Sequence, residues 1–324
     1  MKGWVWDRYG SPDVVELQDV PAPEPGPGEV LVRVHAASVN PYDWRHVRAD
    51  PMIVRGVAGL RRPKPGSILG ADLAGVVERT GAGVTAFQPG DEVFGVVKLG
   101  AFAEYARVPD SVLAHKPAAL SFEEAAAMPM AGLTALAALQ GLRAGQRVLV
   151  NGAAGGIGTF AVQLARAFGA QVTAVCSTRN AALVRSLGAE QVVDYTREDF
   201  TRLGERYDLL IDLIGNQPLR RMRRVLAPRG TLALVGGMAG GGRVLGPLGQ
   251  FARAAVLDRL VGQRLTSVSW QPSGESLRRL AALVEAGRVR PVLDRTYPFA
   301  EVREALRHVE SRRARGKVVI GGIA

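Results

Sequence analysis

One segment near the middle of the chain constrains the fold more than any other. Residues 148–175, VLVNGAAGGIGTFAVQLARAFGAQVTAV, contain an apolar run, a glycine-rich turn, an amphipathic stretch of helix length and a second apolar run. A strand, glycine turn, helix and second strand within about 30 residues are typical of a dinucleotide-binding unit with parallel strands. The segment therefore predicts an α/β sheet whose first turn binds phosphate.

The glycines of this turn have separate physical roles. Gly155 lets the backbone approach a pyrophosphate, and Gly158 lets the helix pack closely on the preceding strand. Ala153 stands at the first glycine position, so the turn has the pattern A-x-G-x-x-G. Amides at the helix start direct the positive end of the helix dipole at the phosphates. The residues expected to bind the cofactor there are Ala154, Gly155, Gly156 and Ile157.

The chain around this segment alternates apolar runs with stretches of helix length, as repeated βαβ units do. Six strands are predicted, with the sequences RVLVNG, QVTAVCS, QVVDY, YDLLIDLI, GTLALVGG and RLTSVSW. Helices are expected between them near residues 159–168, 181–187, 200–203 and 217–225. Residues 120–270 are therefore predicted to form a doubly wound, parallel, nucleotide-binding sheet.

The two flanking segments have a different pattern. Residues 1–119 consist of short alternating runs cut by glycine and proline, such as EVLVRVHAAS, which predict an antiparallel barrel or sandwich domain. Residues 271–324 contain the helix SGESLRRLAALVEAG, with Ser273 as its expected N-cap and Gly287 at its end, then a further helix and a final strand. These residues resemble the first segment more than the middle one. We expect the C-terminus to return to the first domain.

Composition excludes several classes of protein. Cys176 is the only cysteine, so intramolecular disulfides and cysteine-rich zinc sites are excluded, and a cytoplasmic location is expected. Proline or glycine interrupts the uncharged stretches 125–142 and 148–165, so no membrane span is expected. The net charge is +11, but the basic runs RRMRR and RRARGK contain no aromatic residue for base stacking. Nucleic acid is therefore not an expected partner.

The residues after the second strand of the sheet predict which dinucleotide binds. A site for NAD has an acidic side chain about 20 residues beyond the turn for the ribose 2′-OH, whereas a 2′-phosphate requires a cation. Ser177 stands at that position, and Arg179 follows two residues later. NADPH is the predicted cofactor, and a solvated surface arginine is the alternative interpretation of Arg179.

Seven motifs occur in order along the chain: AASVNPYDWR, GADLAGVVERTGAGVTAFQPGDEVFG, GAFAEYARVP, AGLTAL, NGAAGGIG, QVVDY and GKVVI. Together they resemble the medium-chain dehydrogenase/reductase superfamily, and within it the zinc-independent NADPH:quinone oxidoreductase-like branch. The resemblance implies a Rossmann domain, residues 120–270, inserted into a GroES-like, mainly β substrate domain built from residues 1–119 and 271–324.

The resemblance also bears on metal. Zinc-dependent members have a cysteine at the position of Asn40, a His-Glu pair at the positions of Ala71 and Asp72, and a four-cysteine loop that is absent here. Catalytic zinc needs three protein ligands and an open position. The four histidines show no metal-ligand spacing: His35, His46, His115 and His308. No zinc is therefore expected.

Hydride transfer without a metal suits acceptors whose negative charge can delocalise. The resemblance therefore implies transfer from NADPH to a quinone or an α,β-unsaturated carbonyl compound. A simple ketone is less suited, because its developing alkoxide lacks the stabilisation that a metal provides. Two alternatives stay open: a metal-free NADP-dependent alcohol or aldehyde dehydrogenase, and a non-catalytic relative that binds nucleotide or RNA.

The motif AASVNPYDWR supplies the candidate catalytic residues. Asn40, which the family places at the active site, can present its amide to the nicotinamide or the acceptor, or can be a turn residue before Pro41. Tyr42 stands where zinc-dependent relatives carry a proton-relay hydroxyl, and is either the proton donor or a packed side chain. Asp43 is expected to hold the loop. Candidates for the acceptor pocket, with a core role as the alternative, are Trp44, His46 and Phe102.

Further positions follow from the resemblance. Thr134 and Tyr195 match residues that contact the cofactor phosphates in relatives. Val235 and Gly236 end a strand, where the nicotinamide is expected, and they open a glycine-rich loop over residues 235–242 that is a candidate lid.

The strand RLTSVSW is expected at a sheet edge, where two copies would pair as a homodimer.

Overall fold

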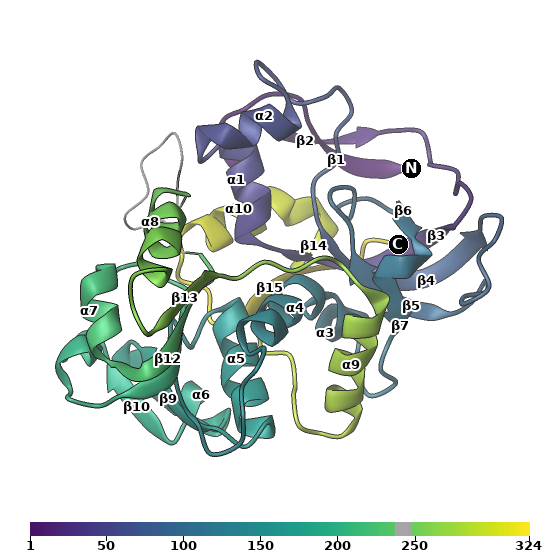
Figure 1. Cartoon of the computed structure of the whole chain (residues 1–324). Coiled ribbons are helices and arrows are strands. Elements are labelled where there is room, and N and C mark those ends of the chain that lie inside the picture. The colour runs from purple at the N-terminus through teal and green to yellow at the C-terminus, as the bar shows by residue number, and fades with distance from the viewer. Residues whose placement is uncertain (237–245, 247) are drawn as a thin grey trace. The chain divides into compact units, whose positions relative to one another are not determined.

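The structure, a computed structural model, describes residues 1–236, 246 and 248–324. The chain divides into two compact units, which can be followed by colour in Figure 1. Unit 1 combines residues 1–133 with residues 271–324, and unit 2 spans residues 134–270. Residues 237–242 of the candidate lid loop lie outside the described residues.

The first boundary between the units lies inside helix α4 (Pro129–Ala138), later than the boundary expected after residue 119. The segment before it contains helix α3 (Phe122–Ala126), which packs against strands of unit 1. Ala125 and Ala126 are fully buried there. Tertiary packing therefore assigns α3 to unit 1, while the part of α4 from Thr134 onward belongs to unit 2.

Unit 1 is mainly β, as the sequence predicts. Its strands are β1 (Lys2–Trp6), β2 (Val15–Asp19), β3 (Glu29–Val39), β4 (Asp72–Thr80), β5 (Glu92–Val96), β6 (Tyr105–Pro109), β7 (Leu113–His115), β14 (Leu293–Pro298) and β15 (Lys317–Gly321). A seven-stranded sheet has the order β14-β15-β3-β4-β5-β7, with β6 paired to β3, and β1 and β2 form a separate antiparallel ribbon. Strand β15 runs antiparallel to β3, with Val318 opposite Val39. The C-terminal strand is thus an inner strand of the sheet.

Helices cover the ends and edges of this sheet. Besides α3, they are α1 (Pro41–Arg48), α2 (Arg55–Ala58), α9 (Gly274–Glu285) and α10 (Val302–Glu310). The predicted cap of α9 is confirmed, because the Ser273 hydroxyl accepts a hydrogen bond from the Ser276 amide at 3.4 Å. The core of unit 1 is rich in aromatic residues, and Trp6 and Phe102 are fully buried in it.

Unit 2 is the predicted doubly wound sheet. Its strands are β8 (Arg147–Asn151), β9 (Gln171–Cys176), β10 (Gln191–Asp194), β11 (Tyr207–Asp212), β12 (Leu226–Leu234) and β13 (Arg264–Ser267). They pair in parallel in the order β10-β9-β8-β11-β12-β13. The helices that start within this unit are α5 (Gly156–Ala167), α6 (Ala181–Ser186), α7 (Leu219–Arg224) and α8 (Leu248–Asp258). All six predicted strands are confirmed.

Two local predictions in unit 2 need correction. The helix expected over residues 200–203 is a single 3-10 turn, Phe200–Arg202, and it begins after Asp199, whose carboxylate accepts from the Thr201 amide. Helix α8 is missing from the predictions. Only Ala254 of α8 is fully buried, while Phe251 and Leu257 pack half-buried against the core of unit 2.

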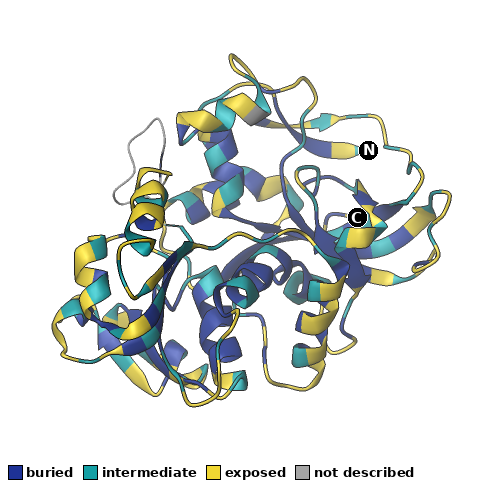
Figure 2. Ribbon diagram, in the orientation of Figure 1, coloured by how far each residue is buried: buried dark blue, intermediate teal, exposed yellow. Residues whose placement is uncertain are grey.

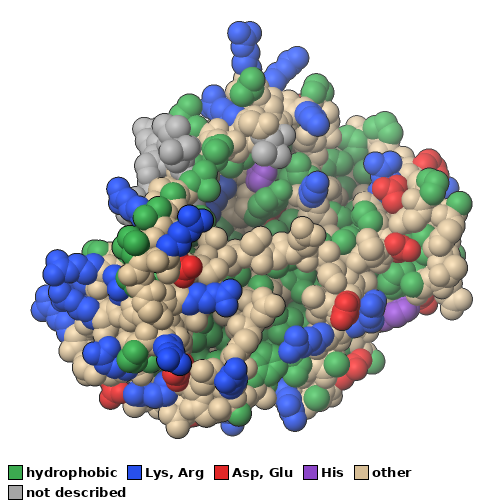
Figure 3. Space-filling view, viewed as in Figure 1, with side chains coloured by type: hydrophobic (Ala, Val, Ile, Leu, Met, Phe, Trp, Pro, Cys, Tyr) green, Lys and Arg blue, Asp and Glu red, His purple; other side chains and the backbone are tan. Residues whose placement is uncertain are grey.

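The surface agrees with ordinary packing of helices on sheets. In Figure 2 the strands are mostly buried, and exposed positions lie in loops and on one face of helices such as α9. Basic side chains gather over α7 in Figure 3, where Arg220, Arg221 and Arg224 are exposed. Cys176 is buried as a free thiol. None of the described helices combines the length and the apolar character needed to cross a membrane.

Candidate functional site

The glycine turn of unit 2 has the geometry that phosphate binding requires. It follows β8 directly, and Gly152 has a φ of 93°, a conformation that favours glycine. A Cβ on Gly158 would lie 2.3 Å from the carbonyl oxygen of Gly152, so only glycine allows the helix to pack this closely. A Cβ on Gly155 would meet no atom nearer than 3.6 Å. The backbone at Gly155 is therefore open to a ligand.

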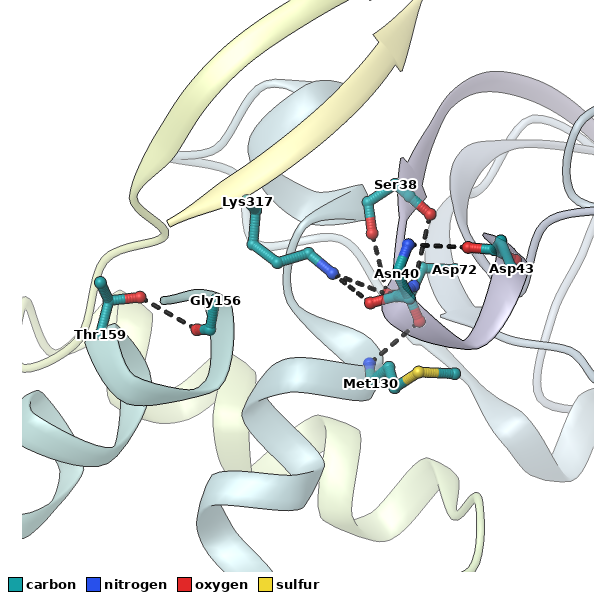
Figure 4. Close-up of polar contacts among 8 residues, drawn as sticks. All are labelled: Ser38, Asn40, Asp43, Asp72, Met130, Gly156, Thr159 and Lys317. Atoms are coloured by element: carbon teal, nitrogen blue, oxygen red, sulfur yellow. Dashed lines mark hydrogen bonds and ion pairs between the residues drawn. The ribbon is translucent and has the colours of Figure 1, made fainter. Parts of the chain in front are cut away.

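Helix α5 begins at this turn without a side-chain cap. Gly155 is the N-cap and has no side chain to accept from the first-turn amides. The Thr159 hydroxyl donates to the carbonyl of Gly156 at 3.0 Å and so points back into its own helix, as Figure 4 shows. The amides at the start of a helix attract anions. The residues present here therefore fit the pyrophosphate of a dinucleotide.

Three predicted cofactor residues come together at the carboxyl end of the sheet. Strands β9 and β10 pair with Cys176 opposite Asp194, and the Tyr195 amide donates to the carbonyl of Cys176 at 3.1 Å. Ser177 therefore lies next to Tyr195, whose side chain is exposed. Arg179 follows in a 3-10 turn, Thr178–Asn180, and its side chain is exposed.

Asp194 is a functional candidate that the sequence reasoning missed. Its carboxylate accepts hydrogen bonds from the hydroxyl groups of Thr178 and Thr196. These bonds, the one to Thr178 first, lower its pKa. Asp194 thereby ties the turn that carries Arg179 to the end of the neighbouring strand. Its position at the end of an apolar strand, QVVD, is the signal that could have identified it.

A buried polar cluster lies where the strand order reverses, between β8 and β11. Asn151 Nδ2 donates to Asp212 Oδ1 at 2.8 Å and to Asn216 Oδ1 at 3.0 Å. The Gly215 amide also donates to Asp212 Oδ1, at 3.0 Å. Burial raises the pKa of the Asp212 carboxyl. Ligands of such sheets bind at this crevice, so the cluster shapes the floor of the predicted cofactor site.

Three further cofactor candidates lie in unit 2. Thr134 is buried in α4. Val235 and Gly236 follow β12, and the Val235 amide donates to the carbonyl of Asp212 at 3.1 Å. Both residues are half-buried. Their cofactor contacts stay predictions of the sequence.

Unit 1 contains a buried network of charged and amide groups around Asn40 and Asp72 (Figure 4). Lys317 Nζ donates to Asn40 Oδ1 at 2.5 Å and lies 3.4 Å from Asp72 Oδ2. Asp72 Oδ2 also accepts from the Ser38 hydroxyl at 2.8 Å and from Asn40 Nδ2 at 3.0 Å. Asp72 Oδ1 accepts from the Met130 amide at 2.9 Å. The network therefore joins the ends of β3, β4 and β15.

The structure gives Asn40 contacts that differ from those expected. Its side chain is only 3% exposed, and both ends of its amide bond to partners within unit 1. It does not extend freely toward a ligand. A contact between Asn40 and the nicotinamide or the acceptor stays a prediction.

Asp43 connects this network to helix α1. Its Oδ2 accepts a 2.7 Å hydrogen bond from the Asn40 amide and completes a capping box, which confirms that Asp43 holds the loop. Among the described residues, Asp43 Oδ1 has no hydrogen-bond partner. Burial raises the pKa of Asp43 to about 7, and the Asp72 carboxylate acts in the same direction. The amides of Asn40 and Gly70 and the Lys317 ammonium oppose the rise.

Tyr42 and His46 lie one turn apart on α1, and their rings pack at a tilt of 49° with centroids 4.1 Å apart. His46 Nδ1 lies 2.8 Å from the carbonyl oxygen of Tyr42, and it must donate because a carbonyl only accepts. Burial, and after it the Asp43 carboxylate, raises the pKa of the Tyr42 phenol. No described group forms a hydrogen bond with Tyr42 Oη. Tyr42 thus keeps an available proton at neutral pH.

The predicted acceptor-pocket residues are buried in unit 1. Phe102 is fully buried and packs so closely on Gly70 that a Cβ there would lie 2.4 Å from its ring. Trp44 is 4% exposed and belongs to the same core. His46 packs edge-on against Trp6, with ring centroids 5.9 Å apart. All three residues therefore pack as core residues, which is the alternative that the sequence analysis gave to an acceptor pocket.

The residues at the position of the superfamily's zinc site do not fit a metal. In the part of the chain that the structure describes, no three His, Cys, Asp or Glu side chains group together as ligands. Asn40 and Asp72 instead contact the ammonium of Lys317. A cation placed between them would be repelled by this charge and would find neither a thiolate nor an imidazole.

Comparison with protein families matches two regions of the chain. Residues 26–118 match the alcohol dehydrogenase GroES-like domain, and residues 187–320 match the family described as zinc-binding dehydrogenase. The first region falls within unit 1. The second region covers parts of both units, as expected for a chain whose C-terminal strand lies in unit 1.

Individual proteins are similar over nearly the whole chain. The mitochondrial NAD(P)H oxidoreductase RTN4IP1 of Mus musculus is 35% identical, over 99% of this chain and 89% of its own length. The chloroplastic NADPH-dependent alkenal/one oxidoreductase of Arabidopsis thaliana is 33% identical, over 99% and 79% respectively. The solved structure of the quinone oxidoreductase from Coxiella burnetii gives a TM-score of 0.88 at 31% identity, with 99% of each chain covered.

The titration of Asp43 yields a prediction about stability. Its pKa is about 7 in the folded chain against an ordinary value of 3.8, so the folded state binds this proton more tightly. The free energy of unfolding should therefore fall as pH rises from about 4 to about 7, and then level off. Asp43→Asn can still accept from the Asn40 amide and should remove this component. Urea unfolding of both proteins at several pH values measures the difference.

The exposed Asp19, on β2, provides the control. Asp19→Asn should leave the pH dependence of the unfolding free energy as it is in the unmodified chain. Parallel curves for the unmodified chain and Asp43→Asn would contradict the raised pKa.

Proposed function

Because the chain belongs to the quinone oxidoreductase-like branch of the medium-chain dehydrogenase/reductase superfamily, we propose that it transfers a hydride from NADPH to a quinone or an α,β-unsaturated carbonyl compound. The observation that carries the proposal is the glycine turn. It combines an uncapped helix start with an open backbone at Gly155. The names of the similar proteins support the class of acceptor.

Unit 2 supplies the cofactor site. The first-turn amides of α5 hold the pyrophosphate, and Arg179 with Ser177 holds the 2′-phosphate of NADPH. Asp194 orders this region through Thr178. The bound cofactor supplies the hydride, and the chain provides binding and orientation.

Unit 1 supplies the groups for the acceptor, and we propose that it does so without zinc. Hydride addition to the β-carbon of an enone leaves negative charge on the conjugated carbonyl, which must then gain a proton. Tyr42 keeps its phenolic proton at neutral pH and is the proposed donor. Because the charge delocalises over the acceptor, no Lewis acid is required. Lys317 holds the polar network near the start of α1 in place of a metal.

We also propose that the protein is a homodimer. Strand β13 is the last strand of its sheet, and its outer edge can pair with the same edge of a second copy. A groove of about 800 Å³ beside it is lined in part by Arg264, Thr266 and Ser267. A monomer in solution would contradict this proposal. A cytoplasmic location stays a prediction of the sequence.

An acceptor panel tests the proposed activity. Purified protein is mixed with NADPH and, separately, a 1,4-quinone, an alkyl enone, a saturated ketone, or NADP with a simple alcohol. We expect oxidation of NADPH with the quinone or the enone, and rates with the saturated ketone at least about a hundredfold lower, because its alkoxide lacks stabilisation. Turnover of the alcohol or the ketone alone would instead favour a metal-free alcohol dehydrogenase.

The assignment of Arg179 predicts a change in cofactor preference. Arg179→Ala should raise the KM for NADPH at least about tenfold, which corresponds to a lost charge-assisted contact of about 1.4 kcal/mol. The KM for NADH should change little, because NADH has no 2′-phosphate. Arg224→Ala is the matched control, since this exposed arginine ends α7 and stands before the start of β12, whereas Arg179 follows the end of β9. An unchanged ratio of the two KM values would show that Arg179 has no part in the preference.

Tyr42→Phe tests the proton donor. The variant keeps the ring that packs against His46 and loses only the hydroxyl. At saturating acceptor we expect kcat to fall at least about tenfold, the lower range of general acid catalysis, with the Kd for NADPH unchanged. Tyr105→Phe, on β6, should retain full turnover. A smaller loss in Tyr42→Phe would remove the role.

A further inference from the structure

Lys317 is an unusual residue for the interior of a protein. It begins β15 and is only 3% exposed. Lysine is rarely buried unless it is paired, and a buried ion pair contributes little net stability, because both charges lose their hydration. The stability of the fold therefore does not explain why the charge of Lys317 lies here. The contacts of its ammonium with Asn40 and Asp72 explain it.

The shortest contact of the ammonium is with an amide, not with the carboxylate. Lys317 Nζ lies 2.5 Å from Asn40 Oδ1 and 3.4 Å from Asp72 Oδ2. The opposite end of the Asn40 amide, Nδ2, donates to Asp72 Oδ2 at 3.0 Å. If the Asn40 amide rotated by half a turn, its Nδ2 would face the Lys317 ammonium, and both are donors. Its Oδ1 would then face Asp72 Oδ2, and both are acceptors. Lys317 and Asp72 therefore fix one orientation of the Asn40 side chain.

This fixed side chain controls the start of α1. Asn40 is the N-cap of the helix, and its backbone amide donates to Asp43 in the first turn. Tyr42 lies between these two residues, so its position depends on the same turn. Asp72 is held from a further direction by the Ser38 hydroxyl and the Met130 amide. The chain of contacts runs from Lys317 through Asn40 to α1.

We infer that Lys317 is a positioning residue for reduction of the acceptor: its ammonium, held by Asp72, locks the Asn40 cap and so fixes Tyr42 on α1. This inference rests on the proposed function. The charged groups around the cap are Lys317, Asp72 and Asp43.

Lys317→Met tests the inference. It removes the charge and keeps most of the length of the side chain. A displacement of a catalytic group by about 1 Å can reduce a rate about a hundredfold, so we expect kcat with the enone or quinone to fall at least about tenfold. The Kd for NADPH should stay the same, because its proposed site lies in unit 2. Hydrogen exchange of the amides in α1 should become faster, and this readout does not depend on turnover.

Lys116 provides a matched control within unit 1. Its side chain is 6% exposed, it pairs with Glu92 at 3.0 Å, and its Nζ donates to the carbonyl of Leu120. Lys116→Met thus removes a lysine of similar burial that has no contact with Asn40. It should lower stability while leaving kcat and the exchange of α1 unchanged. Lys317→Arg, which keeps the charge, should recover part of kcat.

A double variant keeps the test informative if Lys317→Met fails to fold. Asp72→Asn with Lys317→Met removes both charges of the buried pair, so neither partner is left charged and unpaired, and the chain should fold while the ammonium is still missing. We expect its stability to recover and its kcat to stay low. Folded variants with kcat within about threefold of the unmodified chain and unchanged exchange in α1 would overturn the inference. If the unmodified chain reduces no acceptor, the proposed function fails, and the exchange of α1 alone decides the role of Lys317.

Discussion

The buried contact of Lys317 with Asn40 and Asp72 holds together three segments that are far apart in the chain. It joins the end of β3, the start of β4 and the start of β15, and so it requires the C-terminal strand to lie inside the sheet of unit 1. An ammonium and a carboxylate can be buried at this point because Ser38, Asn40 and Met130 complete their hydrogen bonds. The same contact sets the start of α1, which carries the candidate catalytic residues.

In unit 2 the proposed binding site is made mainly by the backbone. It binds phosphate through backbone geometry, since the open backbone at Gly155 and the close packing at Gly158 depend on the absence of side chains. Side chains act mainly at the rim of the sheet, where Asp194 orders the turn with Arg179. Within this chain, a rigid polar network in unit 1 and an anion-binding turn in unit 2 divide the proposed reaction between them.

The sequence predicts those features that depend on local patterns. The six strands of unit 2, the glycine turn and the cap at Ser273 are read from periodicity and from residue types that a turn demands. The partners of Asn40 could not be predicted in this way. Lys317 lies 277 positions away, and the pair forms only because β15 takes one register against β3. Asp194 and α8 were missed because each depends on tertiary neighbours.

Transfer of labelled hydride tests the central claim most directly. NADPH carrying deuterium at both positions of nicotinamide C4 is incubated with the protein and an enone, the product is analysed by NMR, and the zinc content of the same sample is measured. The account predicts deuterium at the β-carbon of the product, from protein whose activity is independent of zinc. Product without deuterium at that carbon, or activity that rises and falls with bound zinc, would contradict it.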